Sequence, residues 1–257
     1  MAPRPASDRV RDEWRRRIEA EYRSASIAQH LGLWLIQIGA PAALVGMSQR
    51  AARDELVHAA HARRVYAAAG GVEVPVLDRA SLGLTRHPAD PLELDVARVA
   101  VDVFCLGETV AVRLFSALRT GCSIKPARAA LDRVLRDEVR HRDLGWELLA
   151  WLLDQPAGPS VRALLAQELP RMLATLAMSY APPETRDDAQ ISPGDRAWGL
   201  MSGARYADVL GRSVARDHLP RFARLGVDAA AAWEAARGGD HSVKQASQSA
   251  GELGTMK

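Results

Sequence analysis

Acidic residues and histidines recur at helical spacing in two segments of this chain. The pattern Asp-Glu-x-x-His occurs at residues 54–58 and again at residues 137–141. Residues three apart lie on one face of a helix, so each copy directs a carboxylate and an imidazole at one point, where they can bind a metal ion together. One copy would be a weak indication, because Glu and His fall three apart on many solvent-facing helices. Two copies favour a shared site.

A further glutamate precedes each copy of the pattern. With these two residues, the set comprises four carboxylates and two imidazoles, which is the ligand inventory of di-iron and di-manganese four-helix bundles. The predicted metal ligands, which are also the predicted catalytic residues, are Glu21, Glu55, His58, Glu108, Glu138 and His141.

The spacing of the glutamates agrees with this prediction. The midpoint of Glu21 and Glu55 is residue 38, next to the helix break at residues 39–41. The midpoint of Glu108 and Glu138 is residue 123, inside the break at residues 121–123. If each helix pair folds back at its break, the two glutamates of the pair arrive at the same height, as a metal site requires.

The charge of the set indicates how many ions it would bind. Four carboxylates and two neutral imidazoles carry a charge of −4, which is costly to bury without counterions and which two divalent cations would neutralise. Asp54 and Asp137 directly precede the two motif glutamates. Each is predicted to accept the N–H of the histidine on the opposite helix and so fix its tautomer, the alternative being an ordinary surface acid.

Helix signals surround these residues. Ser7 caps a predicted helix reaching about residue 38, and Pro41 begins a second one that ends at residues 70–71. The Pro- and Gly-bearing stretch 72–90 is predicted to be a long crossover between the second and third helices. Pro91 and Pro126 open the third and fourth helices, which end near residues 121 and 156. Further helices are predicted at 160–179 and 195–225, with interruptions at Pro170 and Pro220.

The composition supports an all-α protein. The 257 residues are rich in strong helix formers, and aromatic residues make up only 5%. Three parts are predicted: a four-helix bundle at 1–156, helices packed on it at 157–237, and a disordered tail at 238–257.

The formal charge of +3 comes with interleaved acids and bases, so a solvated surface is favoured over a nucleic-acid interface. Two cysteines suit a reducing cytoplasm, and no apolar run predicts a membrane span or secretion.

Several of these segments resemble one protein superfamily. The matching segments are residues 21–26, 39–41 and 52–59 in the first half, and residues 107–109 and 137–141 with Trp146 in the second. They resemble the ferritin-like superfamily of di-iron carboxylate proteins, in particular a group of bacterial ferritin-like proteins. The resemblance covers roughly residues 12 to 155, implies the ferritin-like bundle with its long crossover, and implies metal at the same six residues.

The resemblance implies a range of activities, and departures from known members narrow it. The chain lacks a Cys-x-x-Cys module like that of rubrerythrins, about 100 residues follow the fourth helix where bacterioferritins end, and Val134 stands where aryl-amine N-oxygenases have a third histidine. The leading expectation is an oxidoreductase, an oxidase or monooxygenase that uses O₂ as co-substrate to oxidise or hydroxylate a small organic molecule, as in a tailoring step of specialised metabolism.

The expected cofactor is a pair of iron ions cycling between Fe²⁺ and Fe³⁺, with manganese or a mixed Mn/Fe pair as alternatives. An external electron donor and a homodimer are compatible with this expectation, whereas nucleic acid and membranes are not expected partners. Two other classes stay open: an iron-oxidising or peroxide-scavenging protein without an organic substrate, and a helical binding protein whose metal serves stability only.

Substrate-pocket candidates lie one or two turns from the ligands. Ser24 is the strongest, because a polar group facing a bundle core needs a reason to be there. Ala28 and Cys105 are also candidates, with core packing as the alternative for both.

Overall fold

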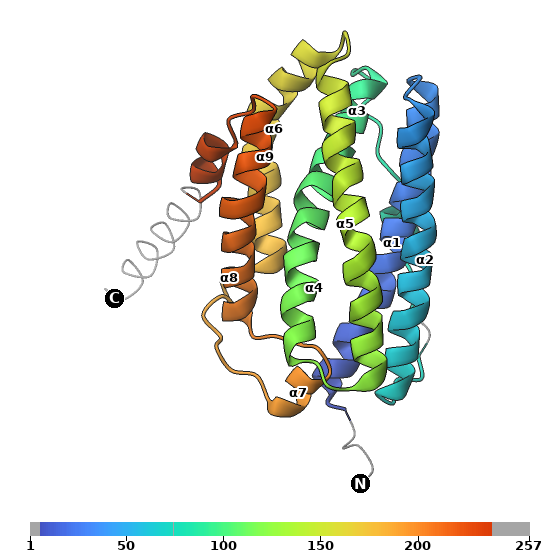
Figure 1. The fold of residues 1–257 in the computed structure, drawn as a ribbon, viewed down its shortest axis with the longest axis vertical. Coiled ribbons are helices and arrows are strands. Elements are labelled where there is room, and N and C mark those ends of the chain that lie inside the picture. Colours follow the sequence, from blue (N-terminus) through green and yellow to red (C-terminus); the bar gives the residue numbers. More distant parts are fainter. Residues whose placement is uncertain (1–5, 74, 238–257) are drawn as a thin grey trace, which may run out of the picture.

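Four long helical segments stand side by side in the computed structural model (Figure 1). The structure describes residues 6–73 and 75–237, and no strand occurs among them, so the predicted all-α class is confirmed. The segments are α1 (Asp8–Gln37), α2 (Ala42–Ala68), the continuous run α3 (Leu92–Val99), η2 (Ala100–Glu108) and α4 (Thr109–Gly121), and α5 (Lys125–Leu153).

The first two helices form an antiparallel hairpin whose ends follow local sequence signals. The Ser7 side chain accepts a hydrogen bond from the Val10 backbone N–H at 3.2 Å, which caps α1 as predicted. Gly39 follows α1 with φ of +70° and Gly70 follows α2 with φ of +90°, a conformation that glycine adopts without a steric penalty.

A long connection then carries the chain from the end of α2 to the start of α3, at the opposite end of the molecule (Figure 1). It contains one short 3₁₀ turn, η1 (Arg79–Leu82), and is fastened to α1 by two hydrogen bonds. Ser26 Oγ donates to the Leu82 carbonyl at 2.6 Å, and the Leu84 N–H donates to His30 Nδ1 at 3.1 Å. Because of this connection, α2 and the run α3–η2–α4 point in the same direction.

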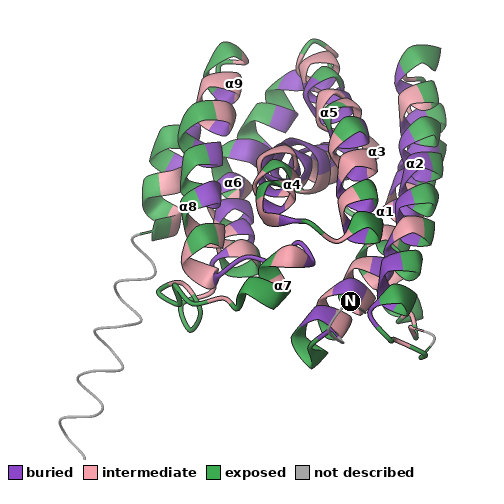
Figure 2. Ribbon diagram, turned by 60° about the horizontal axis from the view of Figure 1, so that its bottom comes forward, coloured by how far each residue is buried: buried purple, intermediate pink, exposed green. Residues whose placement is uncertain are grey.

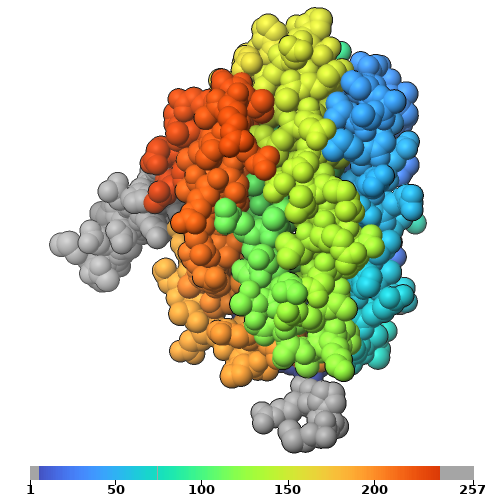
Figure 3. Space-filling model, in the orientation of Figure 1, coloured from blue at the N-terminus to red at the C-terminus, as the bar shows by residue number. Residues whose placement is uncertain are grey.

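Further helices pack on one side of the four segments: α6 (Gly158–Tyr180), α7 (Pro193–Ala197), α8 (Gly203–Ser213), η3 (Val214–His218) and α9 (Leu219–Arg224). In Figure 3 they form the orange to red surface beside α4 and α5. The helix predicted at 160–179 continues through Pro170 as α6, and the one predicted at 195–225 is divided into shorter elements. The tail predicted to be disordered, 238–257, lies outside the described residues.

The run α3–η2–α4 is the central rod, with α5 on one side and the C-terminal helices on the other (Figure 2). This position explains why η2 is apolar around most of its circumference. Helix α5 approaches η2 closely at Gly145, where a Cβ atom would lie 2.6 Å from Cβ of Phe104. No helix in the described part of the chain has the length and apolar character needed to span a membrane.

Candidate metal centre

All four long segments contribute acidic or histidine side chains to one buried cluster. Glu21 comes from α1, Glu55 and His58 from α2, Glu108 from the end of η2, and Glu138 and His141 from α5. The side chain of Glu21 is 12% exposed, and the other five residues are buried. The structure therefore brings together all six residues that the sequence predicts as metal ligands.

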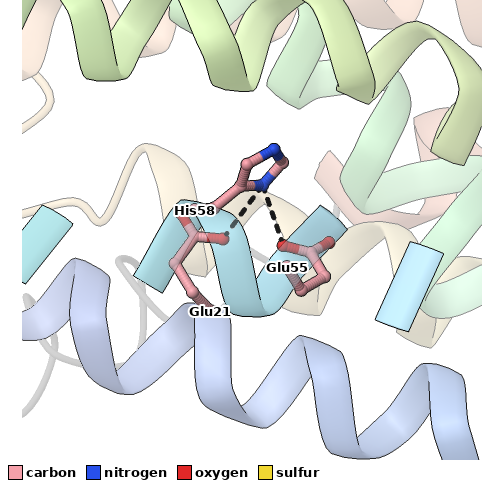
Figure 4. Close-up of side chains that lie close together, drawn as sticks. All are labelled: Glu21, Glu55 and His58. Atoms are coloured by element: carbon pink, nitrogen blue, oxygen red, sulfur yellow. Dashed lines mark hydrogen bonds and ion pairs between the residues drawn. The ribbon is translucent and has the colours of Figure 1, made fainter. Parts of the chain in front are cut away.

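One half of the cluster forms around His58 (Figure 4). Nδ1 of this imidazole lies 3.1 Å from Glu55 Oε2, 3.6 Å from Glu21 Oε2 and 3.9 Å from Glu138 Oε1. The ligand atoms of Glu21, Glu55 and His58 all lie within 4.8 Å of one another, which is close enough for one ion to contact all three.

The other half forms around His141 on the facing helix. Its Nδ1 lies 3.1 Å from Glu55 Oε1 and 3.5 Å from Glu138 Oε2, and these three residues form a second group within 4.8 Å. Nδ1 of His141 and Oε2 of Glu138 are buried and have no well-aligned hydrogen-bond partner. Since buried polar atoms are normally paired, these atoms fit a site that is completed by a cation.

Glu55 and Glu108 have different places in the cluster. Glu55 belongs to both groups and has one carboxylate oxygen facing each histidine. Glu108 is in neither group but lies beside Glu138. Burial and the neighbouring Glu138 carboxyl raise the pKa of Glu108 well above its usual value.

An outer ring of charges orients the two histidines. Each imidazole turns its Nε2 away from the cluster centre toward the motif aspartate of the opposite helix. His58 Nε2 lies 3.0 Å from Asp137 Oδ2, and His141 Nε2 lies 3.7 Å from Asp54 Oδ2. The structure thus places both aspartates beside the histidines with which the sequence pairs them, and the contact of Asp137 is a hydrogen bond.

Two arginines tie these aspartates together. Arg140 Nη2 donates to Asp54 Oδ2 at 2.9 Å and to Asp137 Oδ1 at 2.6 Å. Arg133, two turns before Arg140 on α5, contacts the same two carboxylates. Burial opposes ionisation of Asp137, but its hydrogen bonds to His58 and to both arginines outweigh that effect and lower its pKa. Asp137 is therefore a fixed anionic acceptor for the Nε2–H of His58, and the two arginines hold the Asp54 carboxylate near Nε2 of His141.

The protonation of the ligand groups compensates their charge in the metal-free state. Burial and the Glu55 carboxylate raise the pKa of Glu21, as burial and Glu138 do for Glu108. Burial lowers the pKa of His58, but hydrogen bonds to Glu21 and Glu55 outweigh it and raise that pKa to about 11. For His141 burial is likewise outweighed, by Asp54, Glu138 and Glu55, and its pKa is raised. Burial thus favours the neutral form of the two acids, and the carboxylates favour the charged form of the two imidazoles. If all four groups hold a proton, these protons cancel the charge of −4, and two divalent cations could replace them.

A cavity of about 240 Å³, here called the inner cavity, opens onto four of the carboxylates. Ser24, predicted to face a pocket, does line it. Ala28 and Cys105 do not. Ala28 is buried in the core, where its carbonyl accepts a hydrogen bond from Ser48 Oγ at 2.6 Å, and Cys105 is fully buried. The lining residues are Arg17, Ala20, Glu21, Ser24, Glu55, Val103, Gly107, Glu108, Ala111, Phe115, Glu138 and Tyr180.

The position of Cys105 follows from the π-helical geometry of η2. In an α-helix, a residue three before Glu108 would share its face. A π-helix is wider and its hydrogen bonds join residues five apart, so Val103, five before Glu108, takes the place beside the cavity. The sequence prediction for Cys105 assumed an α-helix and is corrected by this finding.

Side chains from η3 and α5 hold the backbone around Glu108 in place. His218 of η3 is fully buried, and its Nε2–H donates to the Leu106 carbonyl at 3.0 Å, two residues before Glu108. Trp146 of α5 donates through Nε1 to Thr109 Oγ1 at 3.0 Å. These contacts satisfy polar groups on both sides of Glu108 and thereby fix the backbone that carries it.

Sequence reasoning did not find Arg17, Val103, Phe115 and Tyr180 as neighbours of the cluster. Arg17 lies four residues before Glu21, a helical spacing that could have placed it near the site. Tyr180 lies at the end of α6 and has no spacing relation to any ligand.

Comparison with known proteins adds no assignment, since no family model matches the sequence and the search of curated proteins finds no match. The geometry itself defines a buried cluster of carboxylates and imidazoles that could hold a metal ion.

Proposed function

We propose that the cluster binds two divalent metal ions, preferably iron, and that the protein is a ferritin-like dinuclear oxidase or oxygenase acting on a small organic substrate. The observation that carries the proposal is the duplicated half-site: a histidine Nδ1 facing carboxylates shared with the other half, and an Nε2 facing an aspartate of the opposite helix. This donor set of oxygen and imidazole nitrogen suits iron and manganese. The helix order, with a long crossover between α2 and α3, supports the ferritin-like assignment.

The six cluster residues would hold the two ions from different sides. Glu21 and His58 would hold one ion and Glu108 and His141 the other, and the carboxylates of Glu55 and Glu138 would contribute to the same centre. Bound iron would supply the redox chemistry with O₂ that no amino-acid side chain provides. The protein would keep the ions neutralised and partly shielded from water, and the inner cavity would admit a substrate to the carboxylate side of the cluster.

Metal analysis of protein produced with added iron tests the proposal. We expect about two metal ions per chain, consistent with dinuclear sites of this kind. His141→Ala should lower the metal content. The matched control is His61→Ala, because His61 lies one turn beyond His58 on the same helix and is only partly buried. A content near zero in the wild-type protein would refute the proposal.

Reaction of the reduced, iron-loaded protein with O₂ separates the functional classes. An oxidase or oxygenase should consume O₂ in a manner that depends on an organic substrate. An iron-oxidising or peroxide-scavenging protein would consume Fe²⁺ or peroxide without one. If the metal serves stability only, the visible spectrum of the reduced site should be unchanged by O₂ and only the melting temperature should respond to the metal.

A further inference from the structure

A second and larger cavity adjoins the inner cavity. This outer cavity has a volume of about 580 Å³ and shares with the inner one the residues Arg17, Ala20, Phe115 and Tyr180. Sites for small organic ligands typically have volumes of about 300–1,000 Å³. The outer cavity is thus large enough for such a ligand, and its inner end reaches the side chains that border the carboxylate cluster.

Arg17 lies at the junction and has a donor without an acceptor. Its Nε and Nη2 atoms each lie 3.0 Å from Glu13 Oε1, and its guanidinium carbon lies 4.4 Å from the ring centroid of Trp14. These contacts fix the plane of the guanidinium. Its Nη1 is buried and has no hydrogen-bond partner. Leaving a buried charged donor unpaired is unfavourable, so the geometry provides for an acceptor from a ligand.

Two phenols stand near this donor. Tyr180 lines both cavities, and Tyr206 lines the outer one. Burial and the Glu13 carboxylate raise the pKa of Tyr206 to about 12, and burial together with Glu108 raises the pKa of Tyr180. Both hydroxyl groups therefore keep their protons at neutral pH and can donate hydrogen bonds.

The charge and polarity of the outer cavity narrow the ligand class further. Three of its lining residues are arginines and two are acids, which leaves one net positive charge that matches a monoanion. The rest of the wall includes a group of apolar side chains: Leu114, Phe115, Leu118, Leu200 and Met201. A carboxylate oxygen can accept from Arg17 Nη1, the one guanidinium nitrogen not already bonded to Glu13 or to the Gly199 carbonyl, and an apolar body fits this wall.

We propose that the joined cavities bind a carboxylic acid with an apolar tail, its carboxylate on Arg17 Nη1 and its tail against the apolar wall of the outer cavity. The carboxylate end then lies nearest the inner cavity. That this ligand is the substrate rests on the proposed function, whereas its binding does not require the metal.

Calorimetric titration of the metal-free, full-length protein at neutral pH tests the proposal. The probes are octanoate, octanamide, which lacks the charge, and acetate, which lacks the tail. We expect octanoate to bind at least about tenfold more tightly than either control, because a hydrogen-bonded charge pair contributes about 1.5–3 kcal/mol.

Variants of Arg17 locate the binding. Arg17→Gln should weaken octanoate binding about tenfold to a hundredfold. Arg17→Lys keeps the charge beside Glu13 but has no second nitrogen in the place of Nη1, so it should remain folded, with an unchanged circular dichroism spectrum, and still bind octanoate more weakly. Arg15→Gln is the matched control, since Arg15 is on the same helix and lines neither cavity, and it should bind as the wild type does.

The outcomes separate this inference from the proposed function. No binding of octanoate, equal binding of octanoate and octanamide, or unchanged binding by both Arg17 variants would overturn the carboxylate site. Octanoate binding through Arg17 in a protein that takes up no metal would support the carboxylate site and refute the dinuclear enzyme. Uptake of two metal ions together with equal binding of octanoate and octanamide would support the dinuclear centre and refute the carboxylate site.

Discussion

Replacement of Glu108 by glutamine should separate metal binding from folding. Burial and the neighbouring Glu138 raise the pKa of Glu108 well above its usual value, so both effects favour the neutral form of this side chain in the metal-free protein. Glutamine is also neutral and has nearly the same size and shape. Glu108→Gln should therefore change the free energy of unfolding of the metal-free protein by less than about 1 kcal/mol, the size of one ordinary hydrogen bond.

Glu55→Gln is the contrasting variant. Glu55 faces Nδ1 of both His58 and His141 at 3.1 Å and is one cause of the raised pKa of each imidazole. Removing its charge leaves two buried imidazolium ions without their shared partner. Breaking a buried ion pair costs about 3–5 kcal/mol, and the lower end applies because Glu21 and Glu138 remain nearby. We expect a loss of about 3 kcal/mol in the metal-free protein.

Denaturant unfolding of the two metal-free variants at pH 7 measures this difference, and calorimetric titration with Fe²⁺ under anaerobic conditions measures metal binding. Both variants should bind metal at least about tenfold more weakly, since even loss of a partner that only orients a ligand has an effect of that size. If Glu108→Gln destabilised the metal-free protein as much as Glu55→Gln, the protonation of Glu108 would be refuted. If both variants bound two metals with unchanged affinity, their assignment as ligands would be wrong.

Three further perturbations follow from the contacts. Binding of two metals at pH 7 should release protons, up to about four, because the raised pKa values of Glu21, Glu108, His58 and His141 favour their protonated forms in the metal-free protein. Calorimetry in buffers of different ionisation enthalpy measures the number. Metal affinity should therefore rise with pH. Deprotonation of His58 should stop contributing to this rise above its pKa of about 11. Gly145→Ala should destabilise the protein by about 1–3 kcal/mol in thermal unfolding, because the added Cβ would lie 2.6 Å from Cβ of Phe104, whereas Gly211→Ala, which meets no atom within 4 Å, should not. His218→Ala should cost about 0.5–1.5 kcal/mol in the same assay for the lost buried hydrogen bond, since the Leu106 carbonyl then keeps only the Thr109 N–H as donor.

The sequence contains enough information to predict the helices and the cluster because both depend on short-range patterns. Ser7 and the glycines at 39 and 70 mark helix ends through local backbone chemistry, and the structure has helix ends there. The six cluster residues are recognisable because each pair of motifs repeats a spacing and the breaks lie midway between the glutamates. The structure brings them within a few ångströms of one another.

The cavity walls were less predictable because they depend on a local departure from the α-helix. The residue types at positions 100–108 do not predict a π-helix. Because of the π-helical geometry, Val103 lines the inner cavity and Cys105 does not. His218, which donates to the Leu106 carbonyl, lies 112 residues further along the chain. Such a pairing arises from tertiary packing and has no local signal.

The two cavities also draw on different parts of the chain. All six cluster residues lie between Glu21 and His141, whereas the outer cavity takes Tyr180, Leu200, Met201 and Tyr206 from the helices and loops that follow α5. The four long segments alone could therefore assemble the cluster, but they would leave this wall of the outer cavity open. Under the proposed function, substitutions at Leu200 or Met201 should change which carboxylic acids bind without changing metal content, because neither residue contacts the cluster. The C-terminal helices would then be the part of the protein that selects the substrate.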